Sequence, residues 1–369
     1  MTQKTFITAV AVILLFSSFF TFVYAVDTRA IEAVRAKKVL DNSDLQTIDA
    51  FVSQAVNELL NTTDFSSISG IRSIILANSA STEPGQVQYA QQFSESAKKY
   101  IAAALKNAED LTPHKRSYQV VTNLLMLLDG LADSRLADLP LKYVDYNNVV
   151  VCYWAVHCVT NPQIVEKLNS LKEPDTARQI VNRLEGIVAT SGPETLGLIT
   201  KFAGSIKTAD SGDLLFKVAD RRIASYADWS VEDELLDASV LQALADKMAS
   251  SGAGKAEAGR RFGQLFSYVF QRYMKGDDRL SPLQKEQLVS VLVTTEKSGL
   301  AKLTDKSSSN IQKALESADP NSLLKEYNNL FGDSTKPGRL VTEINIDYGK
   351  AADGSPLKAP LPLAKPPKS

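Results

Sequence analysis

Apolar residues recur at spacings of three and four along most of this 369-residue chain. That spacing places the apolar side chains of a segment on one face of an α-helix. The clearest runs are Ile48, Phe51, Val52, Ala55 and Leu59; Val120, Leu124, Leu127, Leu128 and Leu131; and Ile180, Leu184, Ile187 and Val188. The pattern predicts helices near residues 28–40, 44–60, 66–79, 85–110, 114–132, 146–160, 163–171, 175–190, 194–207, 211–227, 231–250, 255–275, 282–302, 308–318 and 321–331.

Several of these segments begin with residues that are typical of helix starts. A proline follows a Thr, Asn, Ser or Asp at Pro113, Pro162, Pro282 and Pro320. Ser43 with Gln46, and Ser281 with Gln284, have the spacing of a capping box, in which each side chain bonds to the other residue's backbone. The joins at 160–162 and 190–193 are too short for crossovers, so successive helices should pack as antiparallel hairpins.

These observations predict an all-α fold of stacked antiparallel helix hairpins over residues 26–337, either an α-solenoid or an α/α toroid. The C-terminus follows other patterns. Alternation of apolar and polar residues predicts one extended strand within 338–348, with Leu340, Thr342, Ile344, Ile346 and Tyr348 on one face. Residues 349–369 are rich in proline and lysine, which predicts a disordered tail.

The N-terminus has the pattern of an export signal. Lys4 precedes an apolar run at 6–16, and Val23 and Ala25 suit cleavage after Ala25. Residues 1–25 are therefore predicted to be a signal peptide, and the mature protein to be periplasmic or secreted. The alternative is an uncleaved membrane anchor, since residues 6–23 are nearly long enough to span a bilayer. A membrane-anchored structural protein would then result.

Composition and charge narrow the range of partners. The chain has 41 Lys and Arg against 42 Asp and Glu, for a net charge of −1, so no overall field favours nucleic acid. Arg260, Arg261 and Arg272 alternate with aromatic residues in 259–274, which is typical of an amphipathic core helix. The acidic residues after Ser230 are what a helix N-terminus prefers. No cofactor is predicted.

Residues 152–158, CYWAVHC, hold both cysteines and one of the two histidines. On a helix Cys152 and Cys158 are separated by a rise of about 9 Å, which is too far for a disulfide. A zinc site would need both cysteines together with His114 and His157. Because neighbours on a helix point about 100° apart, Cys158 and His157 are poorly placed as a nucleophile pair. The segment is predicted to be a buried helix with no metal site.

The stretch NNVVVCYWAVHCV, residues 147–159, resembles the second helix of a HEAT-type repeat. The matching positions are Asn147 or Asn148, Val151, Ala155 and Val159, while Cys152 stands where the family has arginine. The resemblance covers one hairpin, residues 139–171. The chain also resembles exported bacterial helical-repeat proteins. That second resemblance implies no function. Because stacked hairpins offer long concave surfaces and no catalytic constellation competes with that use, the chain is predicted to be a non-catalytic binding or scaffold protein with a protein or polysaccharide partner.

The same stretch is similar to a run in alginate-type polysaccharide lyases with an (α/α) toroid. Asn147, Asn148, Tyr153 and Trp154 match, but two extra residues separate the asparagines from the Tyr-Trp pair, and the histidine of the run is absent. The resemblance implies a lyase as the alternative function, with His157 in place of that histidine. The candidate catalytic residues are then Tyr143, Tyr146, Asn147, Asn148, His157 and Arg178.

We expect export to be followed by cleavage after Ala25, because the small residues at Val23 and Ala25 suit the peptidase. Mass spectrometry of the exported protein should find an N-terminus at Val26. A chain that keeps Met1 or Thr2 in the envelope fraction would instead support the membrane anchor.

Overall fold

The computed structural model describes residues 26–171, 174–250, 253–276, 279–317, 319, 321–333, 335–351 and 353–366. The predicted signal peptide, residues 1–25, lies outside these ranges. The described chain is all-α: it contains isolated β-bridges but no β-strand. In this part of the chain no helix is both long and apolar enough to cross a membrane.

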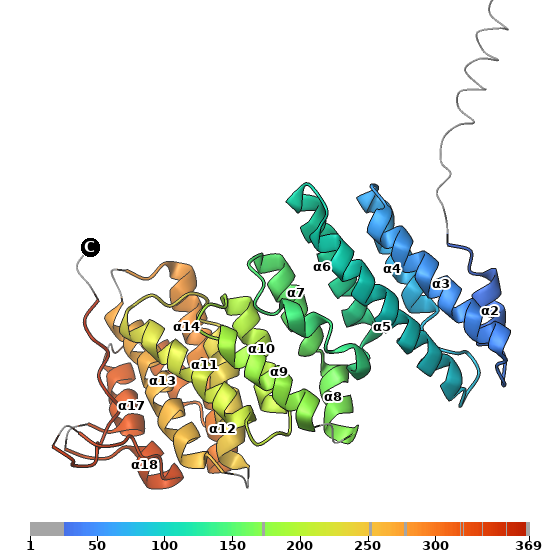
Figure 1. The fold of residues 1–369 in the computed structure, drawn as a ribbon. Helices are drawn as coiled ribbons and strands as arrows, with labels where there is room; N and C mark the ends of the chain where they lie inside the picture. The colour runs from blue at the N-terminus through green and yellow to red at the C-terminus, as the bar shows by residue number, and fades with distance from the viewer. Residues whose placement is uncertain are drawn as a thin grey trace, which may run out of the picture. The chain divides into compact units, whose positions relative to one another are not determined.

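The chain divides into two compact units, Met1–Leu127 and Leu128–Ser369. In the first unit α3 packs against α2, α4 and α5 (Figure 1). Its helices are α2 (Arg29–Arg35), α3 (Asn42–Asn61), α4 (Phe65–Ala77), α5 (Val87–Glu109) and the greater part of α6 (His114–Leu131).

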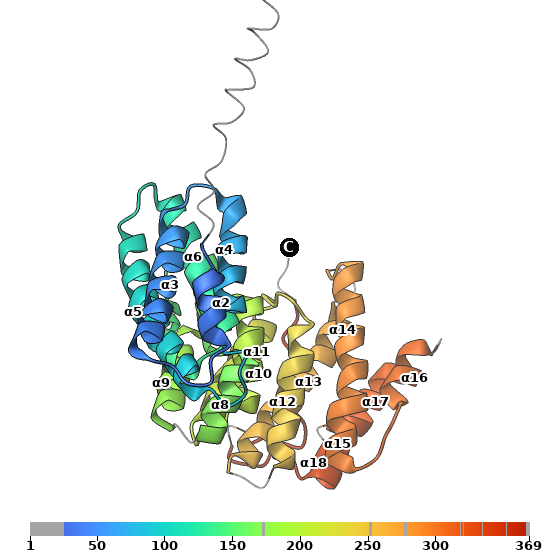
Figure 2. The same ribbon diagram turned by 90° about the vertical axis from the view of Figure 1, so that its right-hand side faces the viewer.

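In the second unit, helices pack against both the next helix and the one after it: α10 contacts α11 and α12, and α11 contacts α12 and α13. Helices α12, α13 and α14 lie side by side in Figure 2. The elements are η2 (Ser134–Leu136), η3 (Pro140–Tyr143), α7 (Val149–Val159), α8 (Pro162–Leu171), α9 (Pro174–Ile187), α10 (Pro193–Ser205), α11 (Ser211–Ala227), α12 (Leu236–Ala249), α13 (Lys255–Lys275), α14 (Pro282–Thr294), the π-helical turn η4 (Thr295–Leu300), α15 (Ala301–Thr304), α16 (Asn310–Glu316), α17 (Ser322–Phe331) and α18 (Arg339–Ile344).

The helix starts follow local capping chemistry. Ser281 and Gln284 form the predicted capping box at the start of α14. The box at α3 is formed by Asp41 and Asp44 instead of Ser43 and Gln46, because the helix begins earlier than the pattern indicated. Asp44 also accepts from Lys37 Nζ at 2.6 Å.

Helix α13 forms the core of the second unit, as its aromatic spacing predicted. Phe262, Phe266 and Phe270 are fully buried along one side of the helix. The rings of Phe266 and Phe270 each lie 5.5 Å from the ring of Phe331 on α17. Because these aromatic side chains are large and closely packed, they anchor α17 to α13.

A buried charge network joins α11, α12 and α13. Arg222 makes a bidentate pair with Asp237, with Nε–Oδ1 and Nη2–Oδ2 distances of 2.7 and 3.0 Å. The Tyr226 hydroxyl donates to the same carboxylate at 2.6 Å, and burial raises the pKa of Tyr226 well above its usual value. Arg272 on α13 donates to Glu234 at 3.1 Å.

This network changes where α12 begins. The acidic residues after Ser230 predicted a helix from 231, whereas α12 begins at Leu236. Glu234 and Asp237 are almost fully buried and bind arginines instead of capping a helix end. A buried carboxylate gains more from a paired guanidinium than from the partial charge of a helix terminus. The loop 228–235 is held in place as a result.

The strand predicted within 338–348 is corrected in its first half, because Arg339–Ile344 forms α18. An unpartnered strand leaves its backbone groups unsatisfied, whereas a helix satisfies them internally. Asn345 adopts a left-handed conformation and ends the helix. The alternation then holds over a short extended segment, in which Ile346 and Tyr348 are buried and Asp347 is exposed.

The disordered tail predicted for 349–369 is also corrected as far as residue 366. Lys350 and Pro356 form an isolated bridge, and Leu357 N donates to Gly349 O at 2.9 Å. Farther along, Leu363 is 3% exposed and lies against α13. The proline-rich segment therefore follows a defined path over the helical body, because side chains of that body bind its backbone.

We expect Arg222→Ala to lower the free energy of unfolding of the second unit by about 3–5 kcal/mol, because it leaves the buried Asp237 without its counter-charge. Arg183→Ala is the matched control: Arg183 pairs with Asp145 at 3.0 Å, and both side chains are about half exposed. The control should cost less than about 1 kcal/mol. Urea unfolding followed by circular dichroism measures both, and equal losses would contradict the role of the network.

Gly263→Ala should detach the extended segment from α13. A Cβ at this position would lie 2.7 Å from Tyr348 Cε1 and 3.3 Å from Ile346 Cγ2. Trypsin should then cleave faster after Lys350, which limited proteolysis with mass spectrometry detects. Gly70→Ala is the control, because nothing lies within 4 Å of a Cβ there, and it should raise stability by up to about 1 kcal/mol. Unchanged cleavage in Gly263→Ala would show that the close approach of Tyr348 is not needed.

Candidate functional site

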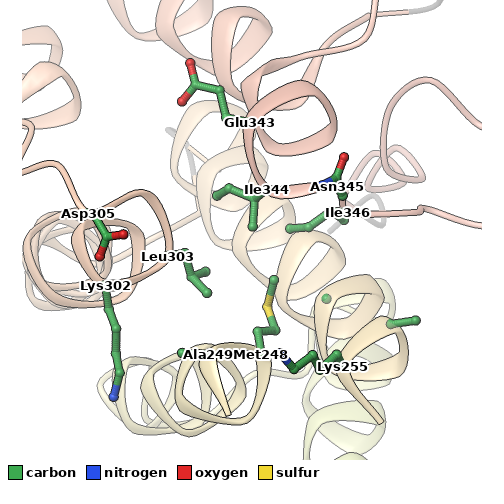
Figure 3. Close-up of a pocket in the computed structure, with 12 residues that line it drawn as sticks. Met248, Ala249, Lys255, Lys302, Leu303, Asp305, Glu343, Ile344, Asn345 and Ile346 are labelled. Carbon is green, nitrogen blue, oxygen red and sulfur yellow. The ribbon is translucent and has the colours of Figure 1, made fainter. Parts of the chain in front are cut away.

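A cavity of about 760 Å³ lies in the second unit, where α12, α13, α15 and α18 come together (Figure 3). Its centre is apolar. Figure 3 shows Met248 of α12, Leu303 of α15 and Ile344 of α18 pointing toward the same space. Ile346, which follows α18, adds a fourth apolar side chain to the lining.

A glycine on α13 makes room for this apolar centre. A Cβ at Gly259 would lie 3.4 Å from Met248 Cε and 3.5 Å from Ile346 Cγ1. Any larger side chain would therefore project into the space between α12 and the segment after α18. Methionine is unbranched and flexible, so Met248 can adjust to molecules of different shape.

Charged side chains form the rim of the cavity: Lys255, Lys302, Asp305 and Glu343. Lys302 Nζ donates to Asp246 at 2.7 Å, and Arg339 donates to Glu343 at 3.1 Å. The hydrogen bond from Arg339 lowers the pKa of Glu343, so this carboxylate is ionised at neutral pH. In Figure 3 the ends of Lys302 and Glu343 point away from the centre. The rim is polar and the centre is not.

The π-helical turn η4 sets the position of α15 on this wall. Within it Glu296 is 1% exposed and accepts hydrogen bonds from Ile311 N at 3.0 Å and Gln312 N at 3.1 Å. Glu296 therefore caps the start of α16 from a distant part of the chain. A π-turn inside a helix displaces the residues that follow, here Leu303 and Asp305.

Two further cavities are shallower and more open to solvent. One, of about 580 Å³ in the first unit, lies along α3 and α5 around Asp49. Asp49 accepts from Tyr100 at 2.6 Å and from Ser96 at 2.8 Å, so its oxygens are already engaged. The other, of about 380 Å³, lies between α10, α12 and η4 and is lined mainly by small residues.

The residues proposed from the lyase resemblance take separate structural roles. Asn148 caps α7, accepting from Val150 N and Val151 N. His157 lies near the other end of α7, with Nδ1 3.0 Å from Asp129 Oδ1. Nine helical positions separate Asn148 from His157, a rise of about 14 Å. The two are therefore not brought together.

The remaining candidates are distributed over η3, the loop after it and α9. Tyr143 is buried, and its ring lies 5.7 Å from that of Tyr146. Asn147 is exposed. Arg178 of α9 pairs with Asp175 and Asp210. None of the six candidates lines the three cavities described above.

The two cysteines are not bonded to each other. The thiol of Cys152 donates to Val144 O at 2.9 Å, and Cys158 is fully buried. Burial raises the pKa of both thiols, which keeps them protonated and poorly nucleophilic. Within the described ranges no group of three His, Cys, Asp or Glu residues is arranged to hold a metal ion.

Sequence reasoning missed the cavity because its lining comes from four separate segments between Met248 and Ile346. One signal pointed to it. Gly259 and Gly263 are four residues apart in a helix whose other residues are mostly large, and such a pair marks a face that another segment approaches closely.

Comparison with known proteins adds no relative: the chain matches no protein-family model, and a search of curated proteins returned no match.

Proposed function

We propose that this chain is a non-catalytic binding protein whose ligand is an amphiphilic small molecule held in the cavity between α12, α13, α15 and α18. The observation that carries the proposal is the convergence of Met248, Leu303, Ile344 and Ile346 on one partly open space. The apolar part of the ligand would lie among these side chains. Its polar end would stay at the charged rim, in contact with water.

The size of the cavity supports this proposal. Small-molecule sites typically have volumes of roughly 300–1,000 Å³. The cavity of about 760 Å³ falls within that range. Of the rim residues, Lys302 and Glu343 already pair with neighbouring charges, which favours a ligand held mainly by its apolar part.

The proposal keeps the stacked-hairpin architecture and the export predicted from sequence. The contacts of α10 with α12 and of α11 with α13 support stacking of hairpins in the second unit. Lys4 and the apolar run at 6–16 support export. A protein or polysaccharide partner is compatible with such a module. The lyase is left out because Asn148, which caps the start of α7, and His157, near its other end, lie far apart.

Filling the cavity should weaken binding of an apolar probe. In Ala256→Trp an indole ring would project from an exposed lining position of α13 into the cavity. We expect it to weaken binding of the neutral fluorescent probe N-phenyl-1-naphthylamine by about tenfold or more, a loss near 1.4 kcal/mol. Fluorescence titration of the purified full chain measures the effect.

Ala224→Trp is the matched control, because Ala224 is exposed on α11 and does not line the cavity. It should leave probe binding unchanged. Lack of saturable binding to the unchanged chain, or equal binding by Ala256→Trp and Ala224→Trp, would contradict the proposed site.

A further inference from the structure

Residues 360–364 of the C-terminal segment lie along α13 and are held by its polar side chains. Gln264, Gln271 and Lys275 stand seven and four positions apart on α13, so they form one stripe on its surface. Trp229, from the loop 228–235, adds a fourth contact. We call these four residues the α13 clamp.

The clamp binds backbone atoms of the segment. Gln264 pairs with Leu361 in both directions, accepting from Leu361 N at 2.9 Å and donating to Leu361 O at 3.0 Å. Gln271 accepts from Leu363 N at 2.8 Å, and Lys275 donates to Leu363 O at 2.7 Å. These contacts reproduce, with side chains, the bonds that a neighbouring β-strand would supply.

The bonded positions coincide with the sequence pattern of the segment. It reads Pro360, Leu361, Pro362, Leu363, so a backbone N–H is present only at the two leucines. Both N–H groups are bound by glutamines of the clamp. Proline at the other two positions favours an extended chain and removes donors that would need partners. The clamp therefore fits an extended chain with proline at alternate positions.

Trp229, the fourth residue of the clamp, has a strained backbone conformation. Its φ is 61°, which is rare for a bulky residue. Arg272 holds it there, with its guanidinium 5.5 Å from the indole ring, while Glu234 binds Arg272 from the same loop. In this position Trp229 Nε1 donates to Ala364 O at 3.1 Å. Strain of this kind is concentrated at binding sites.

We propose that the α13 clamp is a binding site for an extended segment of a partner protein with proline at alternate positions, and that residues 360–364 occupy it in the isolated chain. Most of the hydrogen bonds go to backbone atoms of the segment, and the Leu361 side chain is 52% exposed. Binding to the clamp therefore depends little on the side chains of the bound segment. The Leu363 side chain is only 3% exposed, so the partner segment needs an apolar residue at the position that Leu363 occupies. The intramolecular segment then acts as a competitor for the partner.

The test uses the full chain with its own segment released. Leu361→Pro together with Leu363→Pro removes both N–H donors, and trypsin should then cleave faster after Lys358. A fluorescent peptide with the sequence of residues 357–366, LKAPLPLAKP, is added, and its anisotropy is measured. We expect saturable binding to the released chain, at least about tenfold tighter than to the unchanged chain, where the tethered segment competes at a roughly millimolar effective concentration.

Two controls test the contacts themselves. Gln264→Ala in the released chain changes a partly exposed residue and should weaken peptide binding by about tenfold. A peptide with proline in place of Leu361 and Leu363 leaves the protein untouched and should not bind. The proposal is overturned if the released segment stays protected from trypsin, if the wild-type peptide does not bind the released chain, or if either control binds as the wild type does. Binding of N-phenyl-1-naphthylamine reports the cavity separately.

Discussion

The buried pairing of Arg222 with Asp237 is the interaction on which the second unit depends. Both charges are removed from water, so each is stable only while the other is present. Together with Arg272 and Glu234 the pair ties α11, α12 and α13 to the loop 228–235. Arg272 also contacts Trp229 of that loop, with its guanidinium 5.5 Å from the indole ring. The network therefore positions both the start of α12, whose other end lines the cavity, and the indole group of the clamp.

Helix α13 uses different faces for different purposes. Phe262, Phe266 and Phe270 pack into the core, and Gly259 and Gly263 let the segment after α18 approach the backbone. The polar stripe of Gln264, Gln271 and Lys275 holds the segment farther along. Ile346 belongs to the C-terminal part of the chain as well, and its side chain adds to the cavity lining.

Helices whose limits depend on nearby residues were predicted well. The ranges 211–227 and 255–275 agree with α11 and α13, and the capping box of Ser281 and Gln284 is present. Apolar periodicity and capping act within a few turns, so the local sequence contains them. The predicted start of α12 was wrong because the acidic residues that resemble a helix start bind Arg222 and Arg272 instead, and these arginines lie elsewhere in the sequence. The strand predicted over residues 340–344 was wrong because, in the described part of the chain, no partner strand is available to bind its backbone groups.

The sequence by itself determined the helical class, most helix limits and the pattern that predicts export, since each depends on residues close together along the chain. Only the tertiary structure decided the division into two units, the cavity and the path of residues 345–366. Met248, Gly259, Leu303 and Ile344 have no mutual spacing that a sequence pattern could reveal. They form one site because packing of α12, α13, α15 and α18 brings them together, and packing depends on side-chain shape and buried charge over long distances in sequence.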